Sequence, residues 1–231
     1  MSARSVGARH RGNHRERAWD RYWTEVHRGG RDHPGEFTRW AVPFLRSANA
    51  RNVVDLGCGA GRDLSFLLEQ GFSVTGVDCS TVATELSAKA ISRLDPKVRG
   101  RGCTINDDLL DYLLRLKPES VDAIHAAATY QALSDREVSE LFGEVHRVLA
   151  KGGLHLWTVR NKSHPGRIHP ELVPPNFPML GFTVSVHFFS VEDVGRFRGV
   201  RFEQIALQET ADSYSYLIAD RKRGQPEPPP A

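Results

Sequence analysis

The feature that most constrains this chain is a glycine-rich turn placed directly after an apolar run. Residues 52–56 read Asn-Val-Val-Asp-Leu, and glycines occupy positions 57, 59 and 61 before a helical pattern starts. Glycine lacks a Cβ atom, so it suits a sharp turn and a backbone that lies against a ligand. The spacing differs from the Gly-x-Gly-x-x-Gly that is typical of a pyrophosphate-binding turn. Asp55, just before the turn, would repel a phosphate and attract a cation, so a dinucleotide is not the expected ligand.

Short apolar runs and longer helical patterns alternate along the chain, which is typical of a parallel sheet covered by helices. Apolar residues recur at helical spacing in residues 62–70, 81–94 and 135–149. The pattern therefore predicts an α/β fold. Its seven expected strands are residues 52–56, 73–77, 102–106, 123–126, 154–159, 201–208 and 214–220.

The two ends of the chain differ in composition from the middle. Residues 1–16 are rich in arginine and are expected to form a disordered basic leader, with a nucleic-acid-binding arm or a lid over the site as the alternatives. Residues 223–231 are rich in proline, which cannot continue a helix or donate to a sheet, so a disordered tail is expected. The remainder, residues 17–222, is expected to form a single domain with a substantial core.

Two regions interrupt the alternation of strands and helices. Residues 17–46 are rich in aromatic side chains and are expected to form a helical lid before the first strand. Residues 160–189 contain five prolines and are expected to roof the site, because a long irregular connection is usually functional. The histidines of this roof, His164, His169 and His187, match no standard zinc spacing, so no metal site is expected.

Composition argues against several classes of protein. No stretch approaches the roughly 18 apolar residues of a membrane helix, and no apolar region of a signal peptide follows the N-terminus, so a cytoplasmic protein without a membrane partner is expected. Three irregularly spaced cysteines indicate reduced thiols. The net charge of +3 is small for 231 residues, so nucleic acid is not an expected partner.

Three acidic residues follow neighbouring strands at the edge where open α/β sheets bind ligands. Asp55 would attract a cationic amino group, and Asp78, at the end of the second strand, can accept both hydroxyl protons of a ribose. Asp108, after the third strand, is an acceptor for an adenine amino group, with the Leu109 amide as a donor to the ring. The sequence thus predicts one groove for an amino-acid-like cation and a ribose.

Five segments in this order resemble the motifs of the class I S-adenosylmethionine-dependent methyltransferases. They are Val-Asp-Leu-Gly-Cys-Gly-Ala-Gly (54–61), Val-Thr-Gly-Val-Asp (74–78), Asn-Asp-Asp-Leu-Leu (106–110), Val-Asp-Ala-Ile-His-Ala (121–126) and Arg-Val-Leu-Ala-Lys-Gly-Gly-Leu (147–154). The resemblance implies a Rossmann-like, mostly parallel seven-stranded sheet with helices on both faces and a reversed last strand. It also implies that S-adenosylmethionine is the cofactor. The residues expected to bind this cofactor are Asp55, Gly57, Cys58, Gly59, Gly61, Arg62, Asp78, Cys79, Asp108, Leu109 and Ala126.

Three further segments narrow the resemblance. Gly-Arg-Asp-Leu (61–64), Gln-Gly-Phe-Ser-Val (70–74) and Trp-Asp-Arg-Tyr-Trp (19–23) are similar to the branch that contains tellurite-resistance and thiopurine methyltransferases. This narrower match implies methyl transfer to a small nucleophile, which can be a thiol, a chalcogen, an amine or a hydroxyl group. A peptide or natural-product N-methyltransferase, and a regulatory protein that binds the cofactor without catalysis, are the alternatives.

Methyl transfer from a sulfonium is an in-line displacement with a neutral leaving group, so positioning can supply most of the catalysis, and no catalytic base is assigned. Arg160 follows the fifth strand, and the small residues 126–128 lie at the adjoining strand end, which predicts a compact acceptor with an anionic or strongly polar group. For Arg160 the alternative is a structural ion pair, and for Tyr130 a place in the core is an equal alternative. The residues expected to line the acceptor pocket are Tyr22, Tyr130, Gln131, Arg160 and His164.

Overall fold

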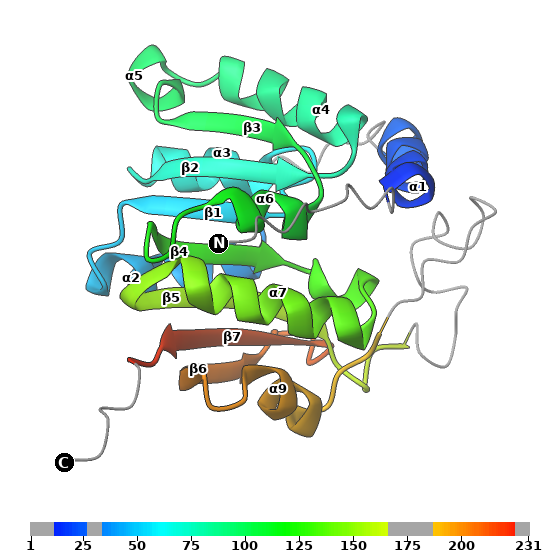
Figure 1. Ribbon diagram of the computed structural model, residues 1–231. Coiled ribbons are helices and arrows are strands. Elements are labelled where there is room, and N and C mark those ends of the chain that lie inside the picture. Colours follow the sequence, from blue (N-terminus) through cyan, green and yellow to red (C-terminus); the bar gives the residue numbers. More distant parts are fainter. Residues whose placement is uncertain (1–11, 27–33, 166–186, 225–231) are drawn as a thin grey trace, which may run out of the picture.

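The computed structural model describes residues 12–26, 34–165 and 187–224. Seven strands form one sheet in the order β3-β2-β1-β4-β5-β7-β6 (Figure 1). The strands are β1 (Asn52–Leu56), β2 (Ser73–Asp78), β3 (Gly102–Asn106), β4 (Val121–Ala127), β5 (Leu149–Arg160), β6 (Phe202–Glu209) and β7 (Ser215–Lys222). Every expected strand is present.

The direction of the strands confirms the predicted fold class. β1 pairs in parallel with β2 and β4, and the parallel pairing continues to β3 and β5. β7 is antiparallel to both of its neighbours, β5 and β6, so the last strand is reversed. The chain winds outward from β1 in one direction and from β4 in the other, which leaves the carboxyl ends of β1 and β4 side by side at the switch point where such sheets bind ligands.

Helices cover both faces of the sheet (Figure 1). The cluster of buried side chains on one face includes residues of α2 (Glu36–Ser47), α3 (Arg62–Glu69) and α4 (Thr81–Ser92). The cluster on the other face includes residues of α6 (Leu109–Arg115), α7 (Asp135–Val148) and α9 (Val191–Arg198). The short elements α5 (Pro96–Arg99) and η1 (Tyr130–Ala132) lie in connections.

Serine residues define where three of these helices begin. Ser80 accepts a hydrogen bond from the Ala83 amide at the start of α4, and Ser134 and Ser190 form capping boxes with Glu137 and Asp193 at α7 and α9. Each cap satisfies amide groups that have no partner within the helix.

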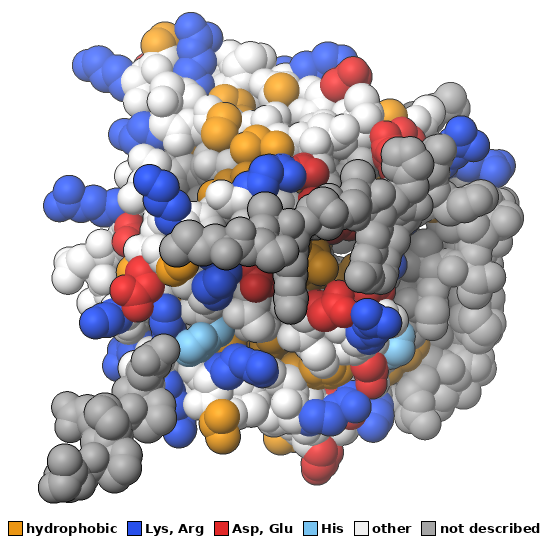
Figure 2. Space-filling view, viewed as in Figure 1, with side chains coloured by type: hydrophobic (Ala, Val, Ile, Leu, Met, Phe, Trp, Pro, Cys, Tyr) orange, Lys and Arg blue, Asp and Glu red, His pale blue; other side chains and the backbone are white. Residues whose placement is uncertain are grey.

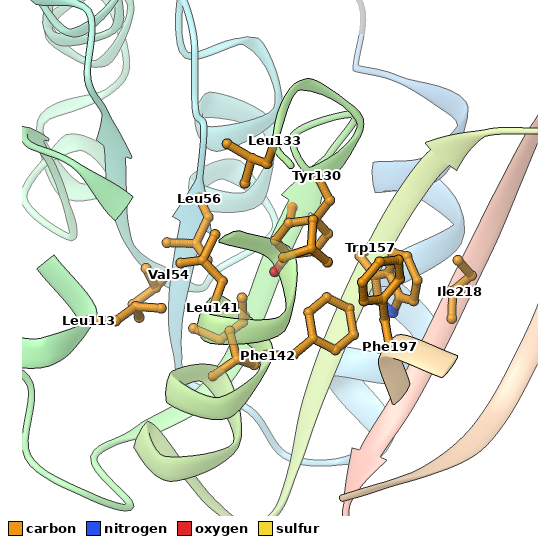
Figure 3. Close-up of a cluster of buried hydrophobic side chains, with 14 of the residues drawn as sticks. Val54, Leu56, Leu113, Tyr130, Leu133, Leu141, Phe142, Trp157, Phe197 and Ile218 are labelled. Carbon is orange, nitrogen blue, oxygen red and sulfur yellow. The ribbon is translucent and has the colours of Figure 1, made fainter. Parts of the chain in front are cut away.

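The cluster against α7 contains the largest buried side chains. Trp157, Tyr130 and Phe142 are fully buried, and their rings meet at centroid distances of 5.1 to 5.8 Å (Figure 3). Aromatic rings at such distances stabilise the core beyond the area that they bury. This packing fixes η1, β5 and α7 relative to one another, and therefore supports the connection that follows the end of β4.

The first helix begins earlier than the sequence predicted. α1 (Gly12–Val26) includes residues 12–16, which were expected to belong to a disordered leader. An ion pair between Arg15 and Glu137 of α7, 2.8 Å long, holds this first part of the helix against the domain. Together α1 and α2 are the helical elements expected in residues 17–46, and α1 lies beyond the carboxyl ends of β1, β2 and β3 (Figure 1).

Other expectations fall wholly or partly outside the described residues. Residues 166–186, including His169, make up most of the expected roof, and residues 1–11 and 225–231 make up most of the expected leader and tail. The two described ends of the roof are joined by a bridge between Asn161 and Phe189. Within the described part of the chain, no helix is long and apolar enough to span a membrane.

Candidate cofactor and acceptor site

The glycine turn has the backbone conformation that its sequence predicts. Gly57, Gly59 and Gly61 have φ angles of +71°, +54° and +80°, a region that other residues rarely adopt. A Cβ atom on Gly57 would lie 2.5 Å from Oγ1 of Thr129, so this position is also closed by packing. The amides of Gly57 and Cys58 both donate to the Val77 carbonyl, which joins the turn to the end of β2.

Asp78 lies directly beside this turn. Its Oδ2 accepts a hydrogen bond from the Gly59 amide at 3.0 Å, and its Oδ1 accepts one from the Ser80 amide at 2.9 Å. Burial raises the pKa of the Asp78 carboxyl to about 6, although both amides act in the opposite direction. The carboxylate therefore faces the turn with its orientation fixed at both oxygens.

Asp55 is the acidic residue under the turn, and it is 1% exposed. Its Oδ1 lies 2.7 Å from Nδ1 of His125 in β4, which is also fully buried. Its Oδ2 is buried and has no hydrogen-bond partner among the described residues. A buried carboxylate oxygen without a donor is costly, so this atom marks a place where a hydrogen-bond donor or a cation would be stabilised.

Helix α1 covers the turn from outside. A Cβ atom on Gly59 would lie 2.5 Å from the indole ring of Trp23, so the backbone of the turn and this indole are in direct contact. Asp20, one turn earlier in α1, accepts hydrogen bonds from the Ser80 hydroxyl at 2.7 Å and from the Val82 amide at 3.2 Å. These contacts anchor α1 on the N-terminus of α4, where a carboxylate is also favoured by the helix dipole.

Asp108 and Leu109 follow β3 at the same edge of the sheet. Asp108 is the N-cap of α6, and its Oδ1 accepts hydrogen bonds from the Leu110 and Asp111 amides. Its Oδ2 has no partner among the described residues and is available to another donor. Leu109 packs partly against the core.

Some residues expected to contact the cofactor have side chains directed elsewhere. The side chain of Ala126 is fully buried in the core cluster that also contains residues of α7. The Cys58 thiol lies beneath the turn, close to Gly76. Arg62 forms an ion pair with Asp63 at 2.7 Å. Burial raises the pKa of Cys58 well above its ordinary value and that of Cys79 to about 12, so both thiols are un-ionised near neutral pH.

Two residues expected in the acceptor pocket make contacts within the framework of the domain. Tyr130 is fully buried among core side chains (Figure 3), and its hydroxyl lies 2.8 Å from Nε2 of His155. Gln131 is 6% exposed. Its side-chain oxygen accepts a hydrogen bond from the backbone amide of Arg160, and its backbone carbonyl accepts one from the backbone amide of His187. These contacts hold η1 against β5.

Replacing Tyr130 with phenylalanine is expected to lower the free energy of unfolding by about 1–3 kcal/mol, because the buried His155 loses its hydrogen-bond partner. Chemical denaturation would measure this loss. The same variant is expected to bind S-adenosylhomocysteine, the demethylated form of the cofactor predicted above, as the wild type does. Weaker ligand binding at unchanged stability would show that Tyr130 belongs to the binding site.

Arg160, Tyr22 and His164 lie together at the carboxyl end of β5. Burial lowers the pKa of the Arg160 guanidinium, and Tyr22 of α1 acts on it in the opposite direction. Burial and the Arg160 charge both lower the pKa of His164, whose ring packs against Phe188 and Tyr214. Nη1 of Arg160 is buried without a hydrogen-bond partner, and the described residues provide no ion pair for it. The alternative of a structural ion pair thus finds no partner in this part of the chain.

The sequence analysis did not assign three contacts of this site: Asp55 with His125, Trp23 with Gly59, and Asp20 with Ser80. The sequence did contain a signal for the contact between Asp55 and His125, because a lone histidine in the otherwise apolar centre of β4 needs a buried partner. The other two depend on where α1 docks, which its own sequence does not specify. Within the described ranges, no group of three or more His, Cys, Asp or Glu residues is arranged to hold a metal ion.

Parts of this chain are similar in sequence to known proteins. Residues 53–153 match the family described as a methyltransferase domain. Glycine N-methyltransferase of Oryctolagus cuniculus is 39% identical over 64 residues, which are 28% of this chain and 20% of that protein. A tRNA N(3)-methylcytidine methyltransferase of Schizosaccharomyces pombe is 24% identical over 91% of this chain and 70% of that protein. The chain thus spans about a fifth of the length of the glycine N-methyltransferase that it matches.

Solved structures agree on the fold. Magnesium protoporphyrin IX methyltransferase from Synechocystis PCC 6803, solved with bound S-adenosylhomocysteine, superposes with a TM-score of 0.62 and 18% identity over 80% of this chain and 81% of that chain. At this level of identity the likeness concerns the fold. Residues 53–153 are thus similar to a methyltransferase domain, and the chain has the Rossmann-like fold of the S-adenosylmethionine-dependent methyltransferases.

Proposed function

We propose that this protein transfers the methyl group of S-adenosylmethionine to a small-molecule nucleophile. The observation that carries the proposal is the pair of buried carboxylates, Asp55 and Asp78, on either side of the glycine turn. Asp78 suits the two hydroxyl groups of a ribose, and the unpaired Oδ2 of Asp55 suits an ammonium group. Asp108 would accept from the adenine amino group.

The bound cofactor would supply an electrophilic methyl group on a positively charged sulfur. The protein's own contribution is to fix the cofactor at the strand ends and to exclude water from the reacting atoms with α1. Trp23 on Gly59 and Asp20 on Ser80 hold α1 in a position that suits this role. Positioning of two reactants is the main catalytic effect expected, and no side chain is assigned as a base.

Two observations favour a small acceptor over a nucleic acid. Lys and Arg side chains are interspersed with Asp and Glu on the face that carries α6, α7 and α9, without the single-sign field that favours a phosphate backbone (Figure 2). The segments after the glycine turn and before β2 also resemble the tellurite-resistance and thiopurine branch. The buried, unpaired Nη1 of Arg160 supports an acceptor with an anionic or strongly polar group.

The decisive experiment measures production of S-adenosylhomocysteine with thiol, chalcogen, amine and hydroxyl acceptors, and with tRNA as a comparison. Turnover of a small acceptor is the expected result. Turnover of tRNA alone would overturn the choice of substrate class. Cofactor binding without turnover of any acceptor would instead favour a regulatory protein.

Replacing Arg160 with lysine keeps the charge but removes the forked donor geometry of the guanidinium. We expect the KM for the acceptor to rise by roughly fivefold, corresponding to about 1 kcal/mol, while the affinity for S-adenosylhomocysteine stays the same. Steady-state kinetics and titration calorimetry would separate the two effects. Equal losses of both affinities, or a lower melting temperature with normal kinetics, would assign Arg160 to the framework.

A further inference from the structure

His125 is an unusual residue for its position. It lies in β4, where its strand neighbours Ile124 and Ala126 are fully buried, and its own ring is 0% exposed. In the parallel pairing of β1 with β4, it is the direct partner of Asp55. Because residues paired across two strands project from the same face, the imidazole and the carboxylate meet at 2.7 Å. A buried imidazole is tolerated only where a partner compensates for its desolvation.

The second nitrogen of this ring is held as well. Nε2 of His125 lies 3.2 Å from Oγ1 of Thr38 in α2, and Thr38 is 0% exposed. The ring of Phe37 stacks on the imidazole with 4.9 Å between the centroids. Thr38, His125 and Asp55 therefore form a buried line of side chains from α2 through β4 to the glycine turn, and each contact restricts the orientation of the next.

We propose that His125, supported by Thr38, is a positioning residue for the cofactor: it binds Oδ1 of Asp55 so that Oδ2 is presented, as a charged acceptor, to the ammonium group of S-adenosylmethionine. The inference rests on the function proposed above and extends it to residues that do not touch the ligand. Oδ2 is the buried oxygen without a partner among the described residues, while Oδ1 is already engaged.

Electrostatics explain why Asp55 needs this partner. Burial raises the pKa of the Asp55 carboxyl, which favours the neutral form, whereas the charge of His125 and its hydrogen bond act in the opposite direction. Burial by itself would lower the pKa of His125, but the Asp55 carboxylate outweighs it and the net shift is upward. Asp63 and Arg62 of α3 are the other charged groups that act on His125, and they pair with each other at 2.7 Å. Each member of the Asp55 and His125 pair thus stabilises the charged form of the other.

The test compares two ligands, S-adenosylhomocysteine and its analogue in which hydrogen replaces the α-amino group. Titration calorimetry on the wild type is expected to show a preference of about 10- to 100-fold for the amino-containing ligand, as a charge-assisted contact provides. In His125→Leu this preference is expected to fall to about threefold or less. His125→Asn can donate from nearly the place of Nδ1 and is expected to retain part of the preference. Thr38→Val is expected to reduce it without removing the imidazole.

His155 provides the matched control. It is another fully buried strand histidine, it is hydrogen-bonded to Tyr130, and it belongs to the opposite core. His155→Leu is expected to lose stability but to keep the wild-type preference between the two ligands. Melting curves on all variants separate loss of fold from loss of preference, and if His125→Leu does not fold, His125→Asn and Thr38→Val decide the question.

The outcomes distinguish this inference from the function on which it rests. A folded His125 variant and a Thr38→Val variant that both keep the full preference would overturn the positioning role alone. A wild type that binds both ligands equally well would show that Asp55 does not receive an ammonium group. A wild type that binds neither ligand would overturn the proposed function, and the inference with it.

Discussion

Replacing Asp78 with alanine is expected to weaken the binding of S-adenosylhomocysteine by about 2–4 kcal/mol, or roughly 30- to 1000-fold. The proposed site assigns both ribose hydroxyl groups to this one charged acceptor. The carboxylate also holds the Gly59 amide, so its loss releases the turn at the same time. Titration calorimetry at pH 8, where Asp78 is ionised, would measure the effect.

A second ligand separates these two contributions. An analogue of S-adenosylhomocysteine without ribose hydroxyl groups is expected to bind the wild type weakly, and Asp78→Ala is expected to weaken it further only by the contribution of the released turn. Asp122 provides the matched control, because its carboxylate also accepts from two backbone amides, those of Arg51 and Asn52, but at the opposite end of the sheet. Asp122→Ala is expected to leave ligand affinity unchanged. Unchanged affinity in Asp78→Ala would show that the ribose lies elsewhere.

The same residue predicts how binding depends on pH. Because the pKa of Asp78 is about 6 in the ligand-free protein, a proton competes with the ribose below that value. Affinity for S-adenosylhomocysteine is therefore expected to be constant above pH 7 and to fall as the pH drops through 6, by up to about tenfold per unit. In the free protein the sign is opposite: a carboxyl with a raised pKa favours folding most at low pH, and this contribution is lost as the pH rises through 6. Flat affinity between pH 5 and 8 would contradict the assignment.

Local sequence predicted the strands well because each apolar run is bounded by turn residues. The run at 102–106 is β3 without adjustment, and 52–56 is β1. β5 is the main exception, since the expected strand begins at Leu154, whereas β5 starts at Leu149 and passes through Gly152 and Gly153. Pairing of Leu149 with Val121 in β4 extends the strand past these glycines. The pairing of strands in the folded sheet therefore decides where β5 begins, and the local sequence does not.

The positions of some site residues could be predicted from the sequence, but the directions of their side chains could not, for a related reason. The acids Asp55, Asp78 and Asp108 could be placed because they follow strands, and the carboxyl ends of parallel strands lie at one edge of the sheet. The direction of each side chain could not be predicted in β4, because a central parallel strand is buried on both faces and shows no alternation of polar and apolar residues. Ala126 was therefore expected at the ligand, while the partnership of His125 with Asp55 was not recognised. That partnership requires the register between β1 and β4, which is set by the whole sheet.

Replacing Gly61 with alanine is expected to lower the free energy of unfolding by about 2–5 kcal/mol, from two independent causes. Gly61 has a φ of +80°, where a side chain strains the backbone. A Cβ atom there would also lie 2.5 Å from Oγ and 2.8 Å from Cα of Ser87 in α4, so the backbone of a packed helix would have to move. Because Gly61 also precedes the first residue of α3, the movement would separate α3 from α4 beneath the glycine turn.

Variants at two other glycines allow the cost of backbone strain to be measured apart from the cost of the steric clash with Ser87. Gly71 has a φ of +101° but no atom within 4 Å of the added Cβ, so Gly71→Ala is expected to cost only the backbone strain of about 1–2 kcal/mol. Gly143 lies within α7 with open space around it, and Gly143→Ala is expected to stabilise the protein by about 0.5–1 kcal/mol. Chemical denaturation of the three variants should therefore rank Gly143→Ala above the wild type, Gly71→Ala below it and Gly61→Ala lowest. If Gly61→Ala were as stable as Gly71→Ala, α3 and α4 would not be in the close contact on which the shape of the turn depends.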